Sequence, residues 1–307
     1  RKKGKRQNEA CGKRILSFTG GQEIMSFSLL PWRKHGVALC LNSSFFGFYA
    51  HAGFLLGLTD LGFKFSHVSG ASAGALVGGL YTAGLSARRM IEIFLQPDLL
   101  RVFTEFRAPL RFIKMLTGRK GHTGIFAGTI LRDLIEKETG PRGIEEANPR
   151  FSLSVLDLRS NRSLVVQSGT LAEYIVASCA VPGLFAAQEL DSGHFWDGGV
   201  ADPLPFEHLL DDPQIRTIVL HLVESSSDEP AHSFYGALVR SHGIISSEII
   251  RLKTLLARHK RKELMILRTR TAPPKPGNRE AGLQAVNAGL STVRANIAAL
   301  RALSRLT

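Results

Sequence analysis

Hydrophobic and polar residues follow two distinct periodicities from residue 36 onward. Short apolar or alternating runs predict strands, whereas apolar positions three and four residues apart predict helices. We expect strands at 37–41, 65–68, 151–157, 163–167 and 215–222. We expect helices at 48–61, 73–83, 87–95 and 130–137, and one amphipathic helix at 281–306. Because strands alternate with helices, the pattern predicts an α/β fold with helices on both faces of a mainly parallel sheet.

The segment 1–24 lacks this pattern and holds seven Lys or Arg residues against two Glu. We expect it to be a disordered basic leader, and we exclude it from fold reasoning. The rest of the chain, 25–307, is expected to form a single domain with a core at 36–222 and a C-terminal helical region at 234–307. The one candidate linker is 271–278, which is rich in proline.

Composition and charge exclude several classes of protein and one kind of partner. The chain has 307 residues, of which 44% are hydrophobic and 21% charged, which excludes a disordered, collagen-like or coiled-coil protein. The net charge of +13 favours an anionic partner. No nucleic-acid recognition module accompanies the basic stretches, so we expect no nucleic-acid partner. The sequence does not predict the oligomeric state.

Three sparse cysteines, Cys11, Cys40 and Cys179, show no CxxC spacing. They predict neither a disulfide framework nor a thiolate zinc site, and a cytoplasmic location is the expectation. The basic residues at 1–14 are not followed by an apolar segment and a small-residue cleavage site, so we expect no signal peptide. No apolar run reaches the roughly 18 residues of a membrane-spanning helix.

The sharpest chemical signal is a GxSxG pentapeptide, Gly70-Ala71-Ser72-Ala73-Gly74, at a predicted strand-to-helix turn. Such a turn exposes the serine hydroxyl, and its neighbours must be small because larger side chains would strike the adjacent strand or helix. The helix that follows supplies a positive dipole end, which stabilises developing negative charge. The alternative is structural: Ser72 could be the N-cap of a buried, glycine-rich helix.

A serine nucleophile needs a base, and two kinds of candidate follow it. The order Ser, Asp, His of α/β-hydrolases would take one of five downstream histidines, His208, His221, His232, His242 and His259. The other candidate is Asp197, in a Trp-Asp-Gly-Gly segment that prolines follow. Gly198 and Gly199 would let this segment approach another backbone closely, although Asp-Gly-Gly is also an ordinary turn sequence.

Together these motifs resemble the patatin-like phospholipases, whose catalytic dyad is a GxSxG serine and the aspartate of a DGG or DGA motif. The segment 177–185, ASCAVPGLF, is similar to the family's segment before that aspartate, and 37–58 resembles its first strand, oxyanion loop and helix. The resemblance covers 36–222. It implies a three-layer α/β/α fold with a mainly parallel central sheet.

The resemblance also implies a reaction. Ser72 would be the nucleophile and Asp197 the general base, with Gly70, Gly74, Gly198 and Gly199 supporting the turns and without a metal or organic cofactor. A phospholipid or other acyl-ester lipid would acylate Ser72, and water activated by Asp197 would release the acid. A carboxylate can act as this base where burial raises its pKa toward neutrality.

The oxyanion loop departs from the family's pattern of glycines and arginine. The aligned residues are Asn42, Ser43, Ser44, Phe45, Phe46 and Gly47. Backbone N–H groups could still form a hole, and the amide or hydroxyls of the first three residues could add donors. Two alternatives therefore remain: a catalytically impaired relative that binds lipid or a partner, and a Ser-His-Asp esterase or thioesterase.

Basic and bulky apolar residues alternate in the segment 99–120. This composition suits a peripheral element that meets an anionic membrane surface. The alternative is that its apolar residues form a stripe facing the core, with a solvated basic back. The segment 251–262 and the helix with Arg294, Arg301 and Arg305 raise the same two alternatives.

Overall fold

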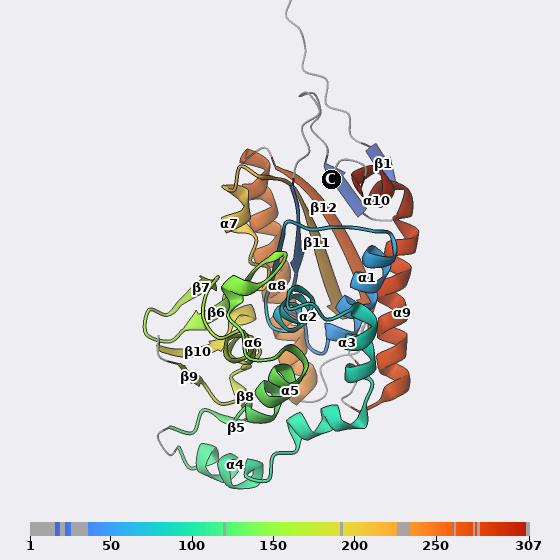
Figure 1. The fold of residues 1–307 in the computed structure, drawn as a ribbon. Coiled ribbons are helices and arrows are strands. Elements are labelled where there is room, and N and C mark those ends of the chain that lie inside the picture. Colours follow the sequence, from blue (N-terminus) through green and yellow to red (C-terminus); the bar gives the residue numbers. More distant parts are fainter. Residues whose placement is uncertain are drawn as a thin grey trace, which may run out of the picture.

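One large sheet organises the molecule (Figure 1). This computed structural model describes residues 16–18, 22–25, 36–118, 121–190, 193–225, 234–260, 262–272, 274 and 277–304. In these residues ten strands form the sheet, in the order β1-β2-β12-β11-β3-β4-β6-β10-β9, and β7 pairs with β6. The strands are β1 Leu16–Phe18, β2 Gln22–Met25, β3 Gly36–Leu41, β4 His67–Gly70, β6 Arg150–Asp157, β7 Arg162–Val166, β9 Gln188–Leu190, β10 Gly193–Asp197, β11 Ile215–Ser225 and β12 Glu263–Thr271.

The five central strands, β12, β11, β3, β4 and β6, are parallel, and antiparallel pairs flank them on both sides. Both faces of this centre are buried, as the apolar run of β3 requires. Val37, Leu39 and Leu41 enter one hydrophobic core, whereas Ala38 and Cys40 enter the other. The predicted α/β fold with a mainly parallel sheet is thus confirmed.

Helices cover the two faces unequally. The larger core contains residues of α1 Phe48–Asp60, α2 Ala73–Thr82, α3 Ala87–Phe94, α5 Thr129–Thr139, α6 Leu171–Ser178, α9 Arg279–Ala295 and α10 Ile297–Ser304. The smaller core contains residues of α7 Glu207–Leu210 and α8 Phe234–His259. The sheet therefore lies between two helical layers, the three-layer arrangement expected from the sequence.

The pairing of the strands brings the predicted site residues together at the carboxyl ends of the parallel strands. Gly70, the last residue of β4, pairs with Leu153 of β6, and Asp197, the last residue of β10, pairs with Val155 of the same strand. β10 runs antiparallel to β6, so it delivers Asp197 to the edge where β4 ends. Residues 72 and 197 meet there although 125 positions separate them.

Two element boundaries differ from the pattern. β4 begins at His67, not at residue 65, because Phe63 and Phe65 stack on each other and contribute buried side chains to the larger core before the strand begins. The helix expected at 281–306 is two helices, α9 and α10. The Asn296 side chain donates to the carbonyl oxygen of Thr292 at 2.7 Å, the acceptor that a continuing helix would give to the Asn296 main chain.

Two expectations about the ends of the chain need correction. The region 234–307 is not purely helical, since β12 lies in it and extends the parallel sheet beside β11. The leader 1–24 is not wholly without structure, because β1 and β2 form a hairpin whose Ile24 and Met25 pair with Met265 and Leu264 of β12. The open edge of β12 accounts for this pairing. The other residues of 1–24 lie outside the described residues.

Candidate active site

Ser72 lies on a strained turn between β4 and α2. Its backbone has φ 51° and ψ −117°, a conformation that costs a non-glycine residue on the order of 1–3 kcal/mol. Gly70 and Gly74 make the turn possible, since a Cβ on Gly74 would collide with the carbonyl oxygen of Leu41 and one on Gly70 with the backbone of Gly74. The turn presents the half-buried Ser72 side chain at the N-terminus of α2.

Asp197 is the hydrogen-bond partner of this serine. Ser72 Oγ donates to Asp197 Oδ2 at 2.6 Å, and the backbone N–H of Gly199 donates to Asp197 Oδ1 at 2.7 Å. Asp197 is only 3% exposed. This burial raises the pKa of Asp197 from 3.8 to about 7, although the hydrogen bonds from Ser72 and Gly199 act in the opposite direction. A carboxylate with that pKa can accept a hydroxyl proton near neutral pH.

The end of α6 holds both residues in place. The backbone N–H of Ser72 donates to Ser178 Oγ at 3.0 Å, and Cys179 Sγ contacts the carbonyl oxygen of Ser72 at 3.3 Å. The N–H of Asp197 donates to the carbonyl oxygen of Ala180 at 2.9 Å. Three consecutive residues therefore fix the separation of Ser72 and Asp197. The sequence analysis assigned no role to Ser178, although it noted the segment 177–185.

The loop 42–47 follows β3 and borders the site. The backbone N–H of Asn42 donates to the carbonyl oxygen of His221, and that of Ser43 donates to the carbonyl oxygen of Pro203. The Asn42 side chain accepts a hydrogen bond from the Val223 N–H at 2.8 Å. These donors and this amide thus hold the loop against its neighbours. Of the candidates among residues 42–44, the buried hydroxyl of Ser44 has no partner within the described residues.

Gly199 packs against the same loop. A Cβ at this position would collide with Ser43 Oγ, so only glycine allows the aspartate segment to approach so closely. Gly198 is equally restricted, because its Cβ would meet the carbonyl oxygen of Ser154. Phe46 has φ 54°, and its ring lies 5.6 Å from that of Phe103, centroid to centroid. The structure therefore brings the oxyanion-loop candidates beside the aspartate segment.

A buried histidine pair supports the loop. His51 Nε2 lies 2.9 Å from the carbonyl oxygen of Asn42, so this nitrogen carries the proton. His51 Nδ1 then accepts from His221 Nδ1 at 2.8 Å, and His221 Nε2 accepts from the Thr269 hydroxyl at 2.8 Å. Burial lowers the pKa of His51 to about 4 and holds the pKa of His221 well below its ordinary value. Both rings are neutral at physiological pH.

The downstream histidines do not complete a triad in the described residues. His221 bonds to His51 and Thr269, and His208 Nε2 bonds to Ser152 Oγ at 2.9 Å. No described histidine side chain hydrogen-bonds to Ser72. His232 lies outside the described residues, as do the side chains of His242 and His259. The described residues also contain no group of three or more His, Cys, Asp or Glu side chains that could hold a metal ion.

A serine on a strand-to-helix turn and a buried aspartate at hydrogen-bond distance define this candidate site. Comparison with known proteins identifies the family. A model of the family described as patatin-like phospholipase matches residues 39–210. The chain belongs to the patatin-like phospholipase family. The match includes Ser72, Asp197 and the whole of the loop 42–47.

Individual relatives of this patatin-like chain share part of its length. Over 169 residues it is 30% identical to an uncharacterised NTE family protein of Mycobacterium tuberculosis and to one of Mycobacterium bovis. These alignments cover 55% of this chain and 44% of each relative, so it spans less than half of their length. The crystal structure of VipD from Legionella pneumophila has a TM-score of 0.50 and 14% sequence identity, covering 92% of this chain and 69% of VipD. That likeness supports the shared fold.

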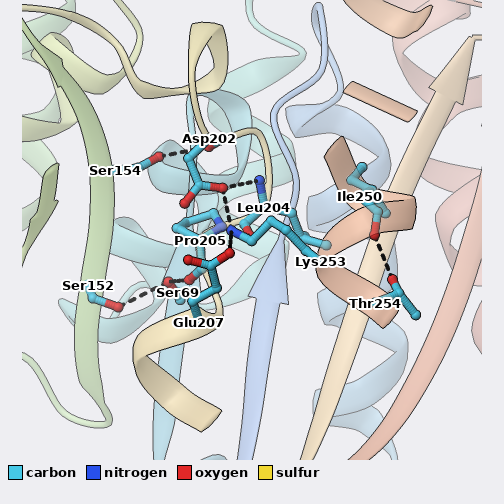
Figure 2. Close-up of polar contacts among 10 residues, drawn as sticks. All are labelled: Ser69, Ser152, Ser154, Asp202, Leu204, Pro205, Glu207, Ile250, Lys253 and Thr254. Carbon is cyan, nitrogen blue, oxygen red and sulfur yellow. Dashed lines mark hydrogen bonds and ion pairs between the residues drawn. The ribbon is translucent and has the colours of Figure 1, made fainter. Parts of the chain in front are cut away.

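A buried lysine holds the segment that follows Asp197 in this patatin-like chain (Figure 2). Lys253 Nζ, from α8, donates to Asp202 Oδ1 and to the carbonyl oxygen of Leu204, each at 2.6 Å, and Glu207 lies 3.8 Å away. Ser154 Oγ donates to the carbonyl oxygen of Asp202 at 3.1 Å. Lys253 therefore ties α8, on one face of the sheet, to the aspartate segment at its edge.

Substitution of Lys253 by Met should destabilise the fold strongly. It leaves the mostly buried Asp202 carboxylate without its cation, which costs about 3–5 kcal/mol. The matched control is Lys260→Met, which removes an exposed ion pair with Asp211 worth under about 1 kcal/mol. Urea unfolding of both variants measures the difference, and Asp202→Asn in the Lys253→Met background should recover part of the loss. Equal losses in the two lysine variants would contradict this role.

Proposed function

We propose that this chain is a lipid acyl hydrolase that cleaves carboxylic esters through a Ser72 acyl-enzyme, with Asp197 as the general base. The observation that carries the proposal is the 2.6 Å hydrogen bond from Ser72 Oγ to a buried carboxylate. Membership of the patatin-like phospholipase family supports a lipid substrate, and the strained turn at Ser72 supports the nucleophile.

The chemistry follows from this geometry. Ser72 Oγ attacks the ester carbonyl carbon while its proton passes to Asp197 Oδ2, and the departing alcohol takes that proton as the ester C–O bond breaks. Water then attacks the acyl-enzyme and gives a proton to Asp197. The bond between Ser72 and the acyl group breaks, Ser72 recovers its proton, and a free carboxylic acid leaves. A pKa of about 7 lets Asp197 both accept and return the proton.

Stabilisation of the oxyanion is assigned to the N-terminus of α2 and the loop 42–47. In that loop the N–H groups of Asn42 and Ser43 already bond to backbone carbonyls, so Ser44, through its N–H or its hydroxyl, is the next candidate donor. The α2 N-terminus supplies further N–H groups and its dipole. Three adjoining residues, Ser178, Cys179 and Ala180, serve as positioning residues because they contact only the backbone of Ser72 and Asp197.

The direct test is turnover by the purified 307-residue chain. We expect release of fatty acid from phosphatidylcholine or lysophosphatidylcholine, and of nitrophenol from p-nitrophenyl butyrate. Lipid binding without release of fatty acid from any of these esters would instead identify an impaired, lipid-binding relative. Activity that survives Asp197→Asn but is lost in a His→Ala variant would assign a histidine triad.

A further inference from the structure

The helix α4, Ala108–Leu116, presents large apolar side chains to solvent. Leu110 is 53% exposed, Ile113 58% and Leu116 68%, while Phe106, just before the helix, is 98% exposed. Phe112 is also exposed. These five residues, called here the α4 face, place a contiguous helical surface of apolar side chains in water, which a soluble monomer does not ordinarily keep without a partner.

Most of the large apolar side chains of α4 point to solvent, whereas a helix that packs on the core points them inward. Ala108 is its buried residue, and Arg111, Lys114 and Met115 are half-buried. The sequence left open whether the apolar residues of 99–120 face the core or a lipid surface. In α4 they face outward.

A buried carboxylate fixes this orientation. Glu105 accepts from Arg111 Nη1 at 2.6 Å and from the backbone N–H groups of Ala127 and Gly128 at 2.8 and 3.0 Å. The two backbone donors lie between β5 Gly124–Phe126 and α5, so the start of α4 is attached to the body of the protein. The exposed face is therefore a rigid feature of the fold.

The α4 face lies at the active-site end of the molecule. Figure 1 shows α4 at the lower end, toward which β11 and β12 point and where the parallel strands finish. Aromatic rings connect it with the site: Phe103, at the end of η1 Pro97–Phe103, lies 5.6 to 6.0 Å, centroid to centroid, from Phe46, Phe126 and Phe185. Phe46 belongs to the loop beside Ser72 and Asp197. Packed aromatic rings thus link the segment before α4 to the loop beside Ser72 and Asp197.

The positive charges beside the α4 face indicate what binds there. Arg107 is exposed and Lys114 half-buried, and neither forms an ion pair within the described part of the chain. Unpaired cations beside exposed apolar side chains match a bilayer that carries anionic headgroups, with each cation near the surface worth about 1 kcal/mol. A partner helix would have to place apolar and acidic side chains in one fixed arrangement that matches α4. The lipids of a fluid anionic surface can rearrange, so a bilayer requires no such fixed match.

We propose that the α4 face docks on the surface of an anionic bilayer and so brings the end of the molecule that carries Ser72 to the lipid. This inference rests on the proposed function, since it names how that site meets its lipid. No helix in the described residues is long and apolar enough to cross a bilayer.

The test separates docking from turnover by using Ser72→Ala protein with vesicles of phosphatidylcholine, with and without phosphatidylglycerol. We expect cosedimentation with the anionic vesicles, weakened about 10-fold or more by Leu110→Ser, Ile113→Ser and Leu116→Ser together. Leu164→Ser with Leu283→Ser is the control, since these exposed leucines lie on β7 and α9, outside the segments that could meet a membrane. A charge variant, Arg107→Glu with Lys114→Glu, should lose the preference for anionic vesicles.

Activity gives a second readout in the Ser72-containing chain. The α4 triple variant should hydrolyse p-nitrophenyl butyrate like the parent and vesicle phospholipid about 10-fold more slowly. Binding without any hydrolysis would contradict the proposed function and still support docking. Vesicle binding that is absent in the parent, unchanged in the α4 variant or lost equally in the Leu164 and Leu283 control would overturn docking. Self-association that the α4 substitutions abolish would also overturn it.

Discussion

Replacement of Ser72 by Ala should reduce ester hydrolysis by this chain roughly 10⁴-fold or more, the scale on which serine hydrolases lose kcat when the nucleophile is removed. The physical reason is that Ala has no hydroxyl to replace Ser72 Oγ, which donates to Asp197 Oδ2 at 2.6 Å, so the acyl-enzyme on residue 72 cannot form. Steady-state rates with a phospholipid and with p-nitrophenyl butyrate measure the effect.

The matched control for this variant is Ser163→Ala, which removes an exposed hydroxyl on β7 and should leave the rates unchanged. Circular dichroism of both variants should match that of the parent, because Ala at position 72 keeps the backbone contacts to Ser178 and Cys179. Retention of more than about a tenth of the parental rate by S72A would remove Ser72 from the mechanism.

Substitution of Asp197 by Asn should lower kcat about 10²–10⁴-fold, the usual contribution of a general base. The parental rate should rise with pH and level off above about pH 7, because only the ionised carboxylate accepts the Ser72 proton and the pKa of Asp197 is raised to about 7. In the Asn variant the residual rate should lack this rise. The matched control is Asp211→Asn, an exposed carboxylate that pairs with Lys260.

The same substitution should increase stability at alkaline pH. Because the folded pKa of Asp197 lies above 3.8, the native state holds a proton between about pH 4 and 7 that the unfolded state releases, so parental stability falls as pH rises through that range. The difference in Tm between the Asn variant and the parent should therefore widen from pH 5 to pH 8. A constant difference, or a parental rate that does not depend on pH around 7, would show that Asp197 is not the titrating base.

These opposite effects on activity and stability describe how the site is held. A buried carboxylate and a serine at positive φ both cost stability, and such costs are common where function requires a fixed geometry. The surrounding contacts offset them: the end of α6 fixes both backbones, and Lys253 fixes the segment after Asp197. The strained pair therefore depends on residues in other elements.

Short segments of the sequence predicted the features that depend on a few adjacent residues, such as the sharp turns and the buried strand β3. The two glycines that flank Ser72 and the two that follow Asp197 mark sharp turns and close approaches, and the structure places each of these four glycines where a Cβ would collide. The continuous apolar run 37–41 predicted a buried strand, and both faces of β3 are buried. These signals reside in a few adjacent residues, so they can be read without knowledge of the fold.

Other features depend on register and burial, which no short segment contains. The contact between Ser72 and Asp197 requires the pairing of both β4 and β10 with β6. Lys253 resembles any other lysine of a basic helix until α8 is seen to cover the aspartate segment. The outward orientation of α4 depends on Glu105, whose partners Ala127 and Gly128 lie more than 20 residues away. Ser178 had a signal in the segment 177–185, but its bond to Ser72 is tertiary.

The central claim is that Ser72 is a nucleophile activated by Asp197, and mapping of a fluorophosphonate adduct tests it most directly. The tryptic peptide 65–88 contains Ser66, Ser69, Ser72 and Ser86, which tandem mass spectrometry distinguishes. We expect a single adduct on Ser72, formed faster as pH rises through about 7 and far more slowly in the Asp197→Asn variant. An adduct on another serine, or equally fast labelling of Ser72 in Asp197→Asn, would contradict this claim.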